Sequence, residues 1–180
     1  MSIAHSGISK WRVLSAALAI LVGQGAQAEL RLTAQAAYVP AIRYISASSQ
    51  ADYYDGFGFG GMLSIVKPNT DFYASYVYSA QKANYTDIDP GPTESVDQYL
   101  GVGVKKYLAT GRRAFIQIGG AALLSDTFDS PKFGASIGGG LSWMLGKRLS
   151  LGTTTLFSMF PYSGFHRRYL HQSLDFGFSF

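Results

Sequence analysis

Residues 173–180 read SLDFGFSF, and this C-terminal stretch decides the fold. Leu174, Phe176, Phe178 and Phe180 alternate with small or polar residues, so a strand here carries apolar side chains on one face only. Membrane-spanning barrels show this pattern because lipid-facing and lumen-facing positions alternate along each strand. A strand of a water-soluble β-sandwich shows the same alternation. The N-terminus of the chain is therefore needed to distinguish a membrane barrel from a soluble sandwich.

The N-terminus has the layout of a secretory signal peptide. Lys10 and Arg12 precede an apolar run at 13–22, and an Ala-Gln-Ala triplet with the small residues of a cleavage site follows. The run is too short for a spanning helix, which needs ~20 apolar residues. We therefore expect residues 1–28 to be removed and the mature chain to begin at Glu29. An uncleaved membrane anchor is the alternative.

The mature chain, residues 29–180, has the length of one domain. It contains no run approaching the ~18 consecutive apolar residues of a spanning helix. In a bilayer every backbone polar group must be paired internally, and without helices this leaves a closed barrel. The absence of cysteine excludes a disulfide framework and thiolate metal sites.

The charge pattern indicates no nucleic-acid partner. The formal net charge of +4 includes Lys10 and Arg12, so loss of the signal peptide leaves a weakly basic chain. No block of lysine and arginine interleaved with aromatic residues is present, and a phosphate-binding surface would need one.

Eight strands are predicted, with short connections alternating with longer ones. The predicted strands are 30–44, 56–66, 71–81, 95–108, 113–124, 132–145, 148–160 and 167–180. Tight turns follow the second, fourth and sixth strands, and longer polar loops follow the others. Outer-membrane barrels have short periplasmic turns and longer extracellular loops, so both termini are expected at the periplasmic rim.

The two faces of these strands differ in composition. The outward face is predicted to carry Phe57, Phe59, Leu63, Ile65, Phe72, Tyr76, Tyr78, Leu100, Val102, Val104, Ile116, Ile118, Leu124, Phe133, Ile137, Leu141, Trp143, Leu145, Leu149, Leu151, Phe157 and Met159. Glycine and serine dominate the inward face, with Arg31, Gln35, Arg43, Asp97, Lys105, Gln117, His171 and Asp175 as its polar candidates. Because the interior of an eight-stranded barrel is just wide enough for side chains, no wide pore is expected.

The signal peptide, the eight alternating strands, glycine-rich segments such as 99–104 and the closing residues 175–180 together resemble the outer-membrane β-barrel family. This family includes opacity-type surface proteins and the transmembrane domain of outer-membrane protein A. The resemblance covers essentially all of 29–180. It implies an all-β, eight-stranded, antiparallel up-and-down transmembrane barrel in the outer membrane, and it implies less about molecular activity.

The resemblance also implies partners. The terminal phenylalanine of such barrels is read by the barrel-assembly machinery, which makes Phe176, Phe178 and Phe180 the expected assembly signal and that machinery a transient partner. Outer-membrane lipids and lipopolysaccharide are the lasting partners. No cofactor is expected.

A polar network is predicted in the lumen from Arg31, Lys105, His171 and Asp175. Arg31, Lys105 and Asp175 point inward near the periplasmic half, and an unpaired buried charge is costly, so ion pairs among them are expected. The alternative is that one or more of these charges faces water at a rim.

His171 and Ser173 offer the one arrangement with catalytic potential. They lie two residues apart on one face of a strand, and small-barrel lipid A deacylases also use a His-x-Ser pair. Those enzymes continue with an asparagine and a downstream acidic residue, whereas Leu174 follows Ser173 here. A lipid A-modifying enzyme is therefore an alternative hypothesis, and no catalytic residue is assigned.

Acidic residues gather in the predicted extracellular loops, namely Asp52, Asp55, Asp87, Asp89, Glu94, Asp126 and Asp129. They could bind divalent cations, but charged loops are more often simply solvated, and no metal site is predicted. The leading hypothesis is a non-enzymatic integral outer-membrane protein with a structural or surface-interaction role. A narrow channel for ions or small solutes is a further alternative.

Overall fold

The computed structural model describes residues 29–45, 50–85, 94–108, 113–126, 128–162 and 165–180. These residues form nine antiparallel strands: β1 (Glu29–Tyr38), β2 (Ala41–Ile45), β3 (Gln50–Lys67), β4 (Thr70–Tyr85), β5 (Glu94–Tyr107), β6 (Ala114–Ser125), β7 (Lys132–Met144), β8 (Leu149–Tyr162) and β9 (Phe165–Ser179). The expected signal peptide lies outside the described residues. Within them, no helix has the length and apolar character needed to cross a bilayer.

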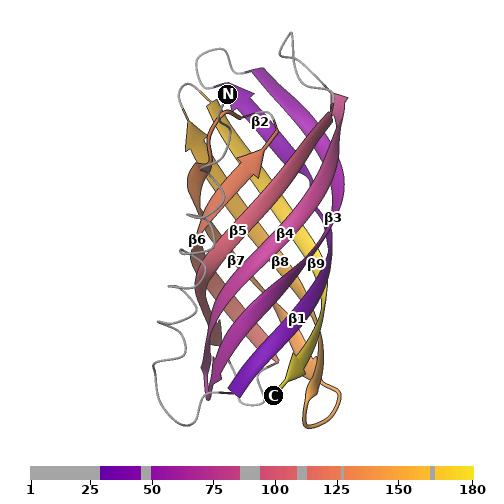
Figure 1. Cartoon of the computed structure of the whole chain (residues 1–180), viewed down its shortest axis with the longest axis vertical. Coiled ribbons are helices and arrows are strands. Elements are labelled where there is room, and N and C mark those ends of the chain that lie inside the picture. Colours follow the sequence, from indigo (N-terminus) through magenta and orange to yellow (C-terminus); the bar gives the residue numbers. More distant parts are fainter. Residues whose placement is uncertain (1–28, 46–49, 86–93, 109–112, 127, 163–164) are drawn as a thin grey trace, which may run out of the picture.

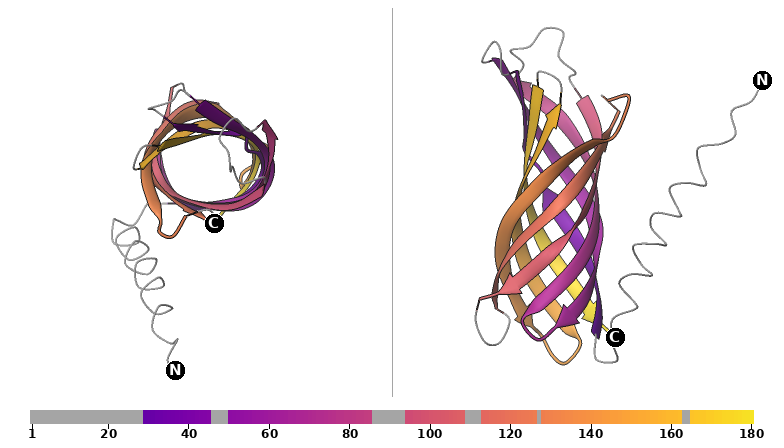
Figure 2. Two further views of the ribbon diagram at one scale, coloured as in Figure 1. Left: turned by 90° about the horizontal axis from the view of Figure 1, so that it is seen from above. Right: turned by 90° about the vertical axis from the view of Figure 1, so that its left-hand side faces the viewer.

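The strands close into a ring of eight, which confirms the predicted barrel (Figures 1 and 2). β1 and β2 together form the first barrel strand, because both pair with β3 on one side and with β9 on the other in an unbroken register. Pro40 interrupts this strand because proline has no N–H to donate to the ladder. Its carbonyl still accepts from the amide of Leu170 at 3.0 Å, and the amide of Val39 donates to Gly56 at 2.7 Å.

The stagger of the strands sets the width of the barrel. A path that crosses every strand through paired residues runs from Arg31 through Ser64, Tyr73, Gly103, Gly119, Ser136, Ser158 and Tyr169, and returns to the first barrel strand at Ala41, ten residues beyond its start. Such a stagger requires the strands to tilt steeply, as Figure 1 shows. The interior of a barrel of this size is filled by side chains.

The outward faces are apolar and exposed, as the alternation predicts. Phe57 and Phe133 are 76% and 74% exposed, and large apolar side chains occupy outward positions on every barrel strand. Ile65 differs, since it lies on the outward face yet is only 6% exposed. Its paired neighbours in the ladder are Leu30 and Phe72, which flank it on both sides.

Two strands are longer than predicted at the end away from the termini. β3 begins at Gln50 rather than at residue 56, and β4 continues to Tyr85 rather than ending at residue 81. Both extensions are rich in polar residues, a composition that is typical of loops. They form strand because they pair with β2 and with each other. These extensions lie beyond the exposed apolar side chains of the outer wall, so neither of their faces needs to be apolar.

Both ends of the described chain lie at one rim. Arg31 pairs with Ser179, and the amide of Phe180 donates to the carbonyl of Leu30 at 2.9 Å. The tight β3–β4 turn and the β7–β8 turn lie at this same rim (Figure 1). The predicted turn at 109–112 lies outside the described residues. We call this rim the lower rim and the opposite one the upper rim.

Neighbouring glycines on β6 face opposite sides of the wall. A methyl group on Gly119 would lie 2.9 Å from the hydroxyl oxygen of Tyr73 and even closer to the backbone carbonyl of Val102, whereas one on Gly120 would meet nothing within 4 Å. The inward position is glycine because the ladder and the ring of Tyr73 leave no room for a Cβ.

This pair of glycines gives a test of the barrel interior. Gly119→Ala should lower the free energy of unfolding by about 1–3 kcal/mol, the usual cost of overpacking. Gly120→Ala should change it by less than about 0.5 kcal/mol. Urea unfolding of the two variants makes the comparison, and equal effects would contradict the inward and outward assignment.

Candidate functional site: the closed barrel interior

The inward side chains form three layers between the lower and upper rims. Along β5 the inward residues run from Tyr107 and Lys105 near the lower rim, past Tyr99, to Asp97 and Ser95 near the upper rim. The layers are a lower charge cluster (Arg31, Asp71, Lys105 and Tyr107), an apolar middle layer, and an upper charge cluster (Arg43, Asp52, Asp97 and Arg167).

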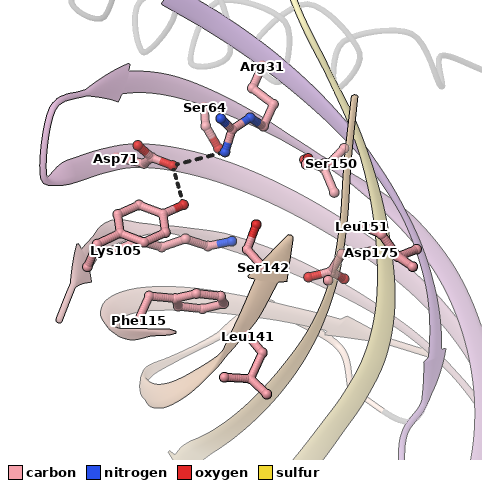
Figure 3. Close-up of a pocket in the computed structure, with 13 residues that line it drawn as sticks. Arg31, Ser64, Asp71, Lys105, Phe115, Leu141, Ser142, Ser150, Leu151 and Asp175 are labelled. Carbon is pink, nitrogen blue, oxygen red and sulfur yellow. Dashed lines mark hydrogen bonds and ion pairs between the residues drawn. The ribbon is translucent and has the colours of Figure 1, made fainter. Parts of the chain in front are cut away.

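Arg31 and Asp71 are the ion pair of the lower charge cluster. Their side chains approach to 3.7 Å, and both are buried. Nε of Arg31 donates to Oγ of Ser179 at 3.1 Å, and the hydroxyl of Tyr107 donates to the Asp71 carboxylate at 2.8 Å. Figure 3 shows the Asp71 contacts with Arg31 and with the tyrosine ring beside Lys105. These bonds tie β1, β4, β5 and β9 together near the lower rim.

Asp175 is not the carboxylate that pairs with Arg31, and the predicted ion pair between them is wrong. Asp175 accepts hydrogen bonds from the Gln35 amide at 3.0 Å, from the Ser173 hydroxyl at 2.7 Å and from the Thr154 hydroxyl at 2.5 Å. Three neutral donors therefore stabilise this buried carboxylate. Asp71, rather than Asp175, lies beside Arg31, because β4 begins at the lower rim, level with the start of β1.

Lys105 lies in the same cluster and contacts aromatic faces. Its ammonium nitrogen is 4.6 Å from the ring centre of Phe115 and 5.9 Å from that of Tyr73, both within the range of a cation–π contact. A cavity of about 20 Å³ lies between Lys105, Arg31, Asp71 and Asp175 (Figure 3). This volume suits a single water molecule.

The middle layer closes the lumen with apolar side chains. Its buried members are Ala37, Val39, Ala41, Tyr54, Val77, Tyr99, Ala121, Leu123, Leu156, Phe160 and Tyr169. Phe160 packs edge-to-face on both Tyr99 and Tyr169, with ring centres 6.1 and 5.7 Å apart. These side chains come from every strand except β7, and they lie between the two charge clusters.

His171 and Ser173 do not form a nucleophile and base. The Ser173 hydroxyl donates to Asp175 at 2.7 Å. Nε2 of His171 makes no hydrogen bond among the described residues, and the imidazole instead packs against Tyr99, with ring centres 4.8 Å apart. His171 therefore belongs to the wall of the apolar layer, while Ser173 belongs to the Asp175 hydrogen-bond group.

Arg167 and Asp97 form the central pair of the upper charge cluster. They come from opposite walls of the barrel, since three barrel strands separate β5 from β9 in either direction. Their charged atoms lie 3.0 Å apart, and both side chains are almost fully buried. The Tyr169 hydroxyl also donates to Asp97 at 2.6 Å. The pair therefore spans the lumen and braces one wall against the other.

Further contacts surround the Arg167 guanidinium. It donates to the side chains of Gln81 at 3.0 Å and Ser95 at 3.1 Å. Its central carbon lies 5.2 to 5.7 Å from the ring centres of Tyr54, Tyr169 and Phe128. Phe128 belongs to the connection between β6 and β7, so this loop packs onto the upper charge cluster.

Arg43 forms a second pair in this cluster, with Asp52 at 2.7 Å. Arg43 was expected to face inward, but Asp52 was expected in an extracellular loop. That expectation is wrong, because Asp52 lies in β3 with 0% exposure. The opposed positions of Arg43 and Asp52 in the β2–β3 ladder bring the two charges together.

The remaining acidic residues do not form a common site. Asp55 lies in β3, where it accepts from the hydroxyl of Tyr38 and the amide of Asn84, and Glu94 begins β5. Asp87 and Asp89 lie outside the described residues. Among the residues that are described, no three acidic or histidine side chains are grouped so as to hold a metal ion.

Two residues that were not predicted from the sequence make most of the contacts within the two charge clusters. Arg167 and Asp71 were not among the inward candidates, although both occupy inward positions by the alternation of their strands. Strict alternation would have found them. The other inward candidate, Gln117, is buried in β6, and the expected assembly residues Phe176, Phe178 and Phe180 are exposed on the outer face near the lower rim.

Two solved structures share this architecture. Neisserial surface protein A has 14% sequence identity and a TM-score of 0.53, with 84% of this chain and 97% of that chain covered. Ail, the attachment invasion locus protein of Yersinia pestis, has 10% identity and a TM-score of 0.50, with 85% and 100% covered. The fold is that of the eight-stranded outer-membrane β-barrels. No protein-family model and no curated protein matches the sequence.

The brace across the lumen of this barrel can be tested by substitution. Arg167→Met should lower the free energy of unfolding by about 3–5 kcal/mol, because it leaves the Asp97 carboxylate buried without its counter-charge. Arg168→Met, at the next and exposed position, should cost less than about 1 kcal/mol.

Urea unfolding of the two variants provides the measurement, and Asp97→Leu combined with Arg167→Met provides the control. Replacing both charges should recover much of the stability lost in Arg167→Met. Equal stability of the wild type and Arg167→Met would contradict the conclusion that the Arg167 and Asp97 pair holds the opposite walls together.

Proposed function

We propose that the chain is an integral outer-membrane protein with a structural or surface-interaction role and no catalytic activity. One observation supports the proposal: large apolar side chains are exposed on every barrel strand, while the charged side chains of the lower and upper clusters lie inside, all of them buried except the partly buried Arg43. Exposed apolar patches of this extent mark surfaces that meet another apolar phase. A hydrocarbon layer that surrounds the whole barrel fits this surface.

The backbone supports the same location. Each barrel strand is hydrogen-bonded to a neighbour on both sides, so the wall presents no free edge to lipid. In this setting the lower rim, with the termini and tight turns, faces the periplasm, and the upper rim faces the exterior. The proposal includes export by residues 1–28, contact with lipopolysaccharide, and recognition of Phe176, Phe178 and Phe180 by the barrel-assembly machinery.

The interior favours a structural or surface role over a channel or an enzyme. The apolar middle layer blocks a path for ions between the two charge clusters. The one histidine and serine pair with catalytic potential lacks the hydrogen bond that a base needs to activate a nucleophile. The two similar structures are, by their names, a surface protein and an attachment invasion locus protein, which supports surface interaction for this chain.

The location is tested by cell fractionation and gel mobility. We expect the mature protein in the outer-membrane fraction, with a faster band when it is not boiled in detergent, because the closed barrel stays compact. A soluble periplasmic protein without a mobility shift would overturn the proposal.

The closed lumen makes a separate prediction. Purified protein in planar lipid bilayers should give no stepwise conductance, because the apolar layer excludes hydrated ions. Regular single-channel steps from folded protein would show instead that the lumen conducts.

The enzyme alternative has its own test. A His171→Ala, Ser173→Ala double variant should leave the lipid A of the producing cells unchanged by mass spectrometry. A change in lipid A acylation that appears with the wild type and disappears with the double variant would restore the enzyme hypothesis.

A further inference from the structure

A short row of polar side chains crosses the outer wall near the lower rim. Lys67 at the end of β3 pairs with Thr70 at the start of β4, and Thr70 pairs with Lys106 near the end of β5. All three residues face outward by the alternation of their strands, and these strands lie side by side (Figure 1). We call Lys67, Thr70 and Lys106 the lysine row. The Cα atoms of its two lysines lie two strand spacings apart, about 10 Å.

The outer wall directly above the lysine row is apolar. The next outward row on the same three strands consists of Ile65, Phe72 and Val104. Nζ of Lys67 lies 5.3 Å from the ring centre of Phe72, within the range of a cation–π contact. The ammonium group of Lys67 therefore lies at the boundary between the lysine row and the apolar wall.

The positive charge of the lysine row has no acidic neighbour in the outward ladder. Lys106 is exposed, and its paired neighbours Thr70 and Ile116 are uncharged. Glu29, at the same rim, occupies an inward position of β1 opposite the buried Val66. The outer wall thus carries a net positive charge at the lower end of β3, β4 and β5.

A second charged row crosses the same three strands near the upper rim. It consists of Asp55, Lys82 and Glu94, which pair with one another in the ladder. Five outward rows lie between the two charged rows, and apart from Gln98 their members are apolar residues, glycine and tyrosine. The outer wall here is therefore an apolar band with a charged row at each end.

The distance between the two charged rows equals the thickness of a hydrocarbon layer. Asp55 and Lys67 are twelve residues apart on β3. A strand rises ~3.3 Å per residue and tilts by ~35–45° in such a barrel, so the rows differ in height by about 30 Å. The hydrocarbon core of a bilayer is ~30 Å thick. In a barrel that spans a bilayer, the lysine row therefore lies at the level of the lipid head groups.

We propose that the lysine row binds the phosphate of an anionic phospholipid in the leaflet at the lower rim, an inference that rests on the proposed function. Lysine binds phosphate oxygens as a point charge, and the hydroxyl of Thr70 is a further donor between the two ammonium groups. The acyl chains of the same lipid then lie along Phe72 and Val104. Two positive charges without a carboxylate favour a head group with net negative charge, since the ammonium of a zwitterionic lipid finds no carboxylate here.

The upper row does not share this preference. In it two carboxylates flank Lys82, so its net charge is negative and repels an anionic head group. On this wall, selection of anionic lipid is therefore confined to the lower rim. Lys82, which is exposed at the opposite end of the same strands, provides a matched control for the lysines of the row.

A tryptophan placed just above the lysine row reports which lipid lies there. Phe72→Trp is combined with Trp143→Phe, which removes the only tryptophan of residues 29–180. The protein is folded into vesicles of phosphatidylglycerol and phosphatidylcholine, and one lipid at a time carries brominated acyl chains that quench tryptophan fluorescence on contact. The two quenching curves give the relative affinity of the two lipids for this part of the wall. We expect phosphatidylglycerol to bind at least about fivefold more tightly, because one lysine near a membrane surface contributes a factor of about five.

Variants in the same background assign the preference to the lysine row. Lys67→Gln combined with Lys106→Gln should reduce it to less than about twofold, whereas Lys82→Gln should leave it unchanged. Inorganic phosphate, compared with chloride at equal ionic strength, should not lower it, because a free ion has no acyl chains to bind the wall. Loss of the preference with inorganic phosphate alone would make the row a site for the free ion and overturn the lipid site.

The outcomes separate this proposal from the proposed function. If barrels with a normal gel-mobility shift are quenched equally by both lipids, or if the double lysine variant keeps the full preference, the lipid site is overturned and the membrane assignment stands. If no variant, wild type included, forms a heat-modifiable barrel in vesicles, the proposed function itself fails and the lipid site with it.

Discussion

Closure of the hydrogen-bond ladder is the constraint on which the rest of this structure depends. An open sheet leaves a row of unpaired amides and carbonyls at each edge, and no solvent is present inside a bilayer to satisfy them. Here the pairing of β1 and β2 with β9 removes both edges. Closure with a stagger of ten residues also fixes the strand tilt and the inner width, and thereby decides which side chains can meet inside.

Within that width, the interior consists of cross-wall contacts rather than a conventional core. The Arg167 and Asp97 pair joins opposite walls, and the Arg31 and Asp71 pair joins β1 to β4 across one intervening strand. Buried pairs of this kind give little net stability compared with apolar packing, but loss of one partner is costly. They therefore favour one arrangement of the strands over others in which the same charges would lie unpaired.

The sequence was sufficient to predict the architecture, because period-two alternation survives in every barrel strand. It placed the outward residues and inward charges such as Arg31, Asp97 and Asp175 on the correct faces. It did not predict which charges pair, since that depends on the stagger around the ring, which no local pattern encodes. Asp52 was misplaced for a related reason: the segment around it is polar, and only pairing with β2 makes it a strand with a buried carboxylate.

The apolar middle layer has a consequence for the cell as a whole. In the proposed membrane setting, a hydrated ion would have to shed its water to pass Phe160, Tyr99 and Leu156, so each copy would carry no ion current. In that setting, the ion leak across the membrane would not rise with the number of molecules inserted. A cell can cover its surface densely with a barrel built in this way and keep the permeability of the envelope under the control of other proteins.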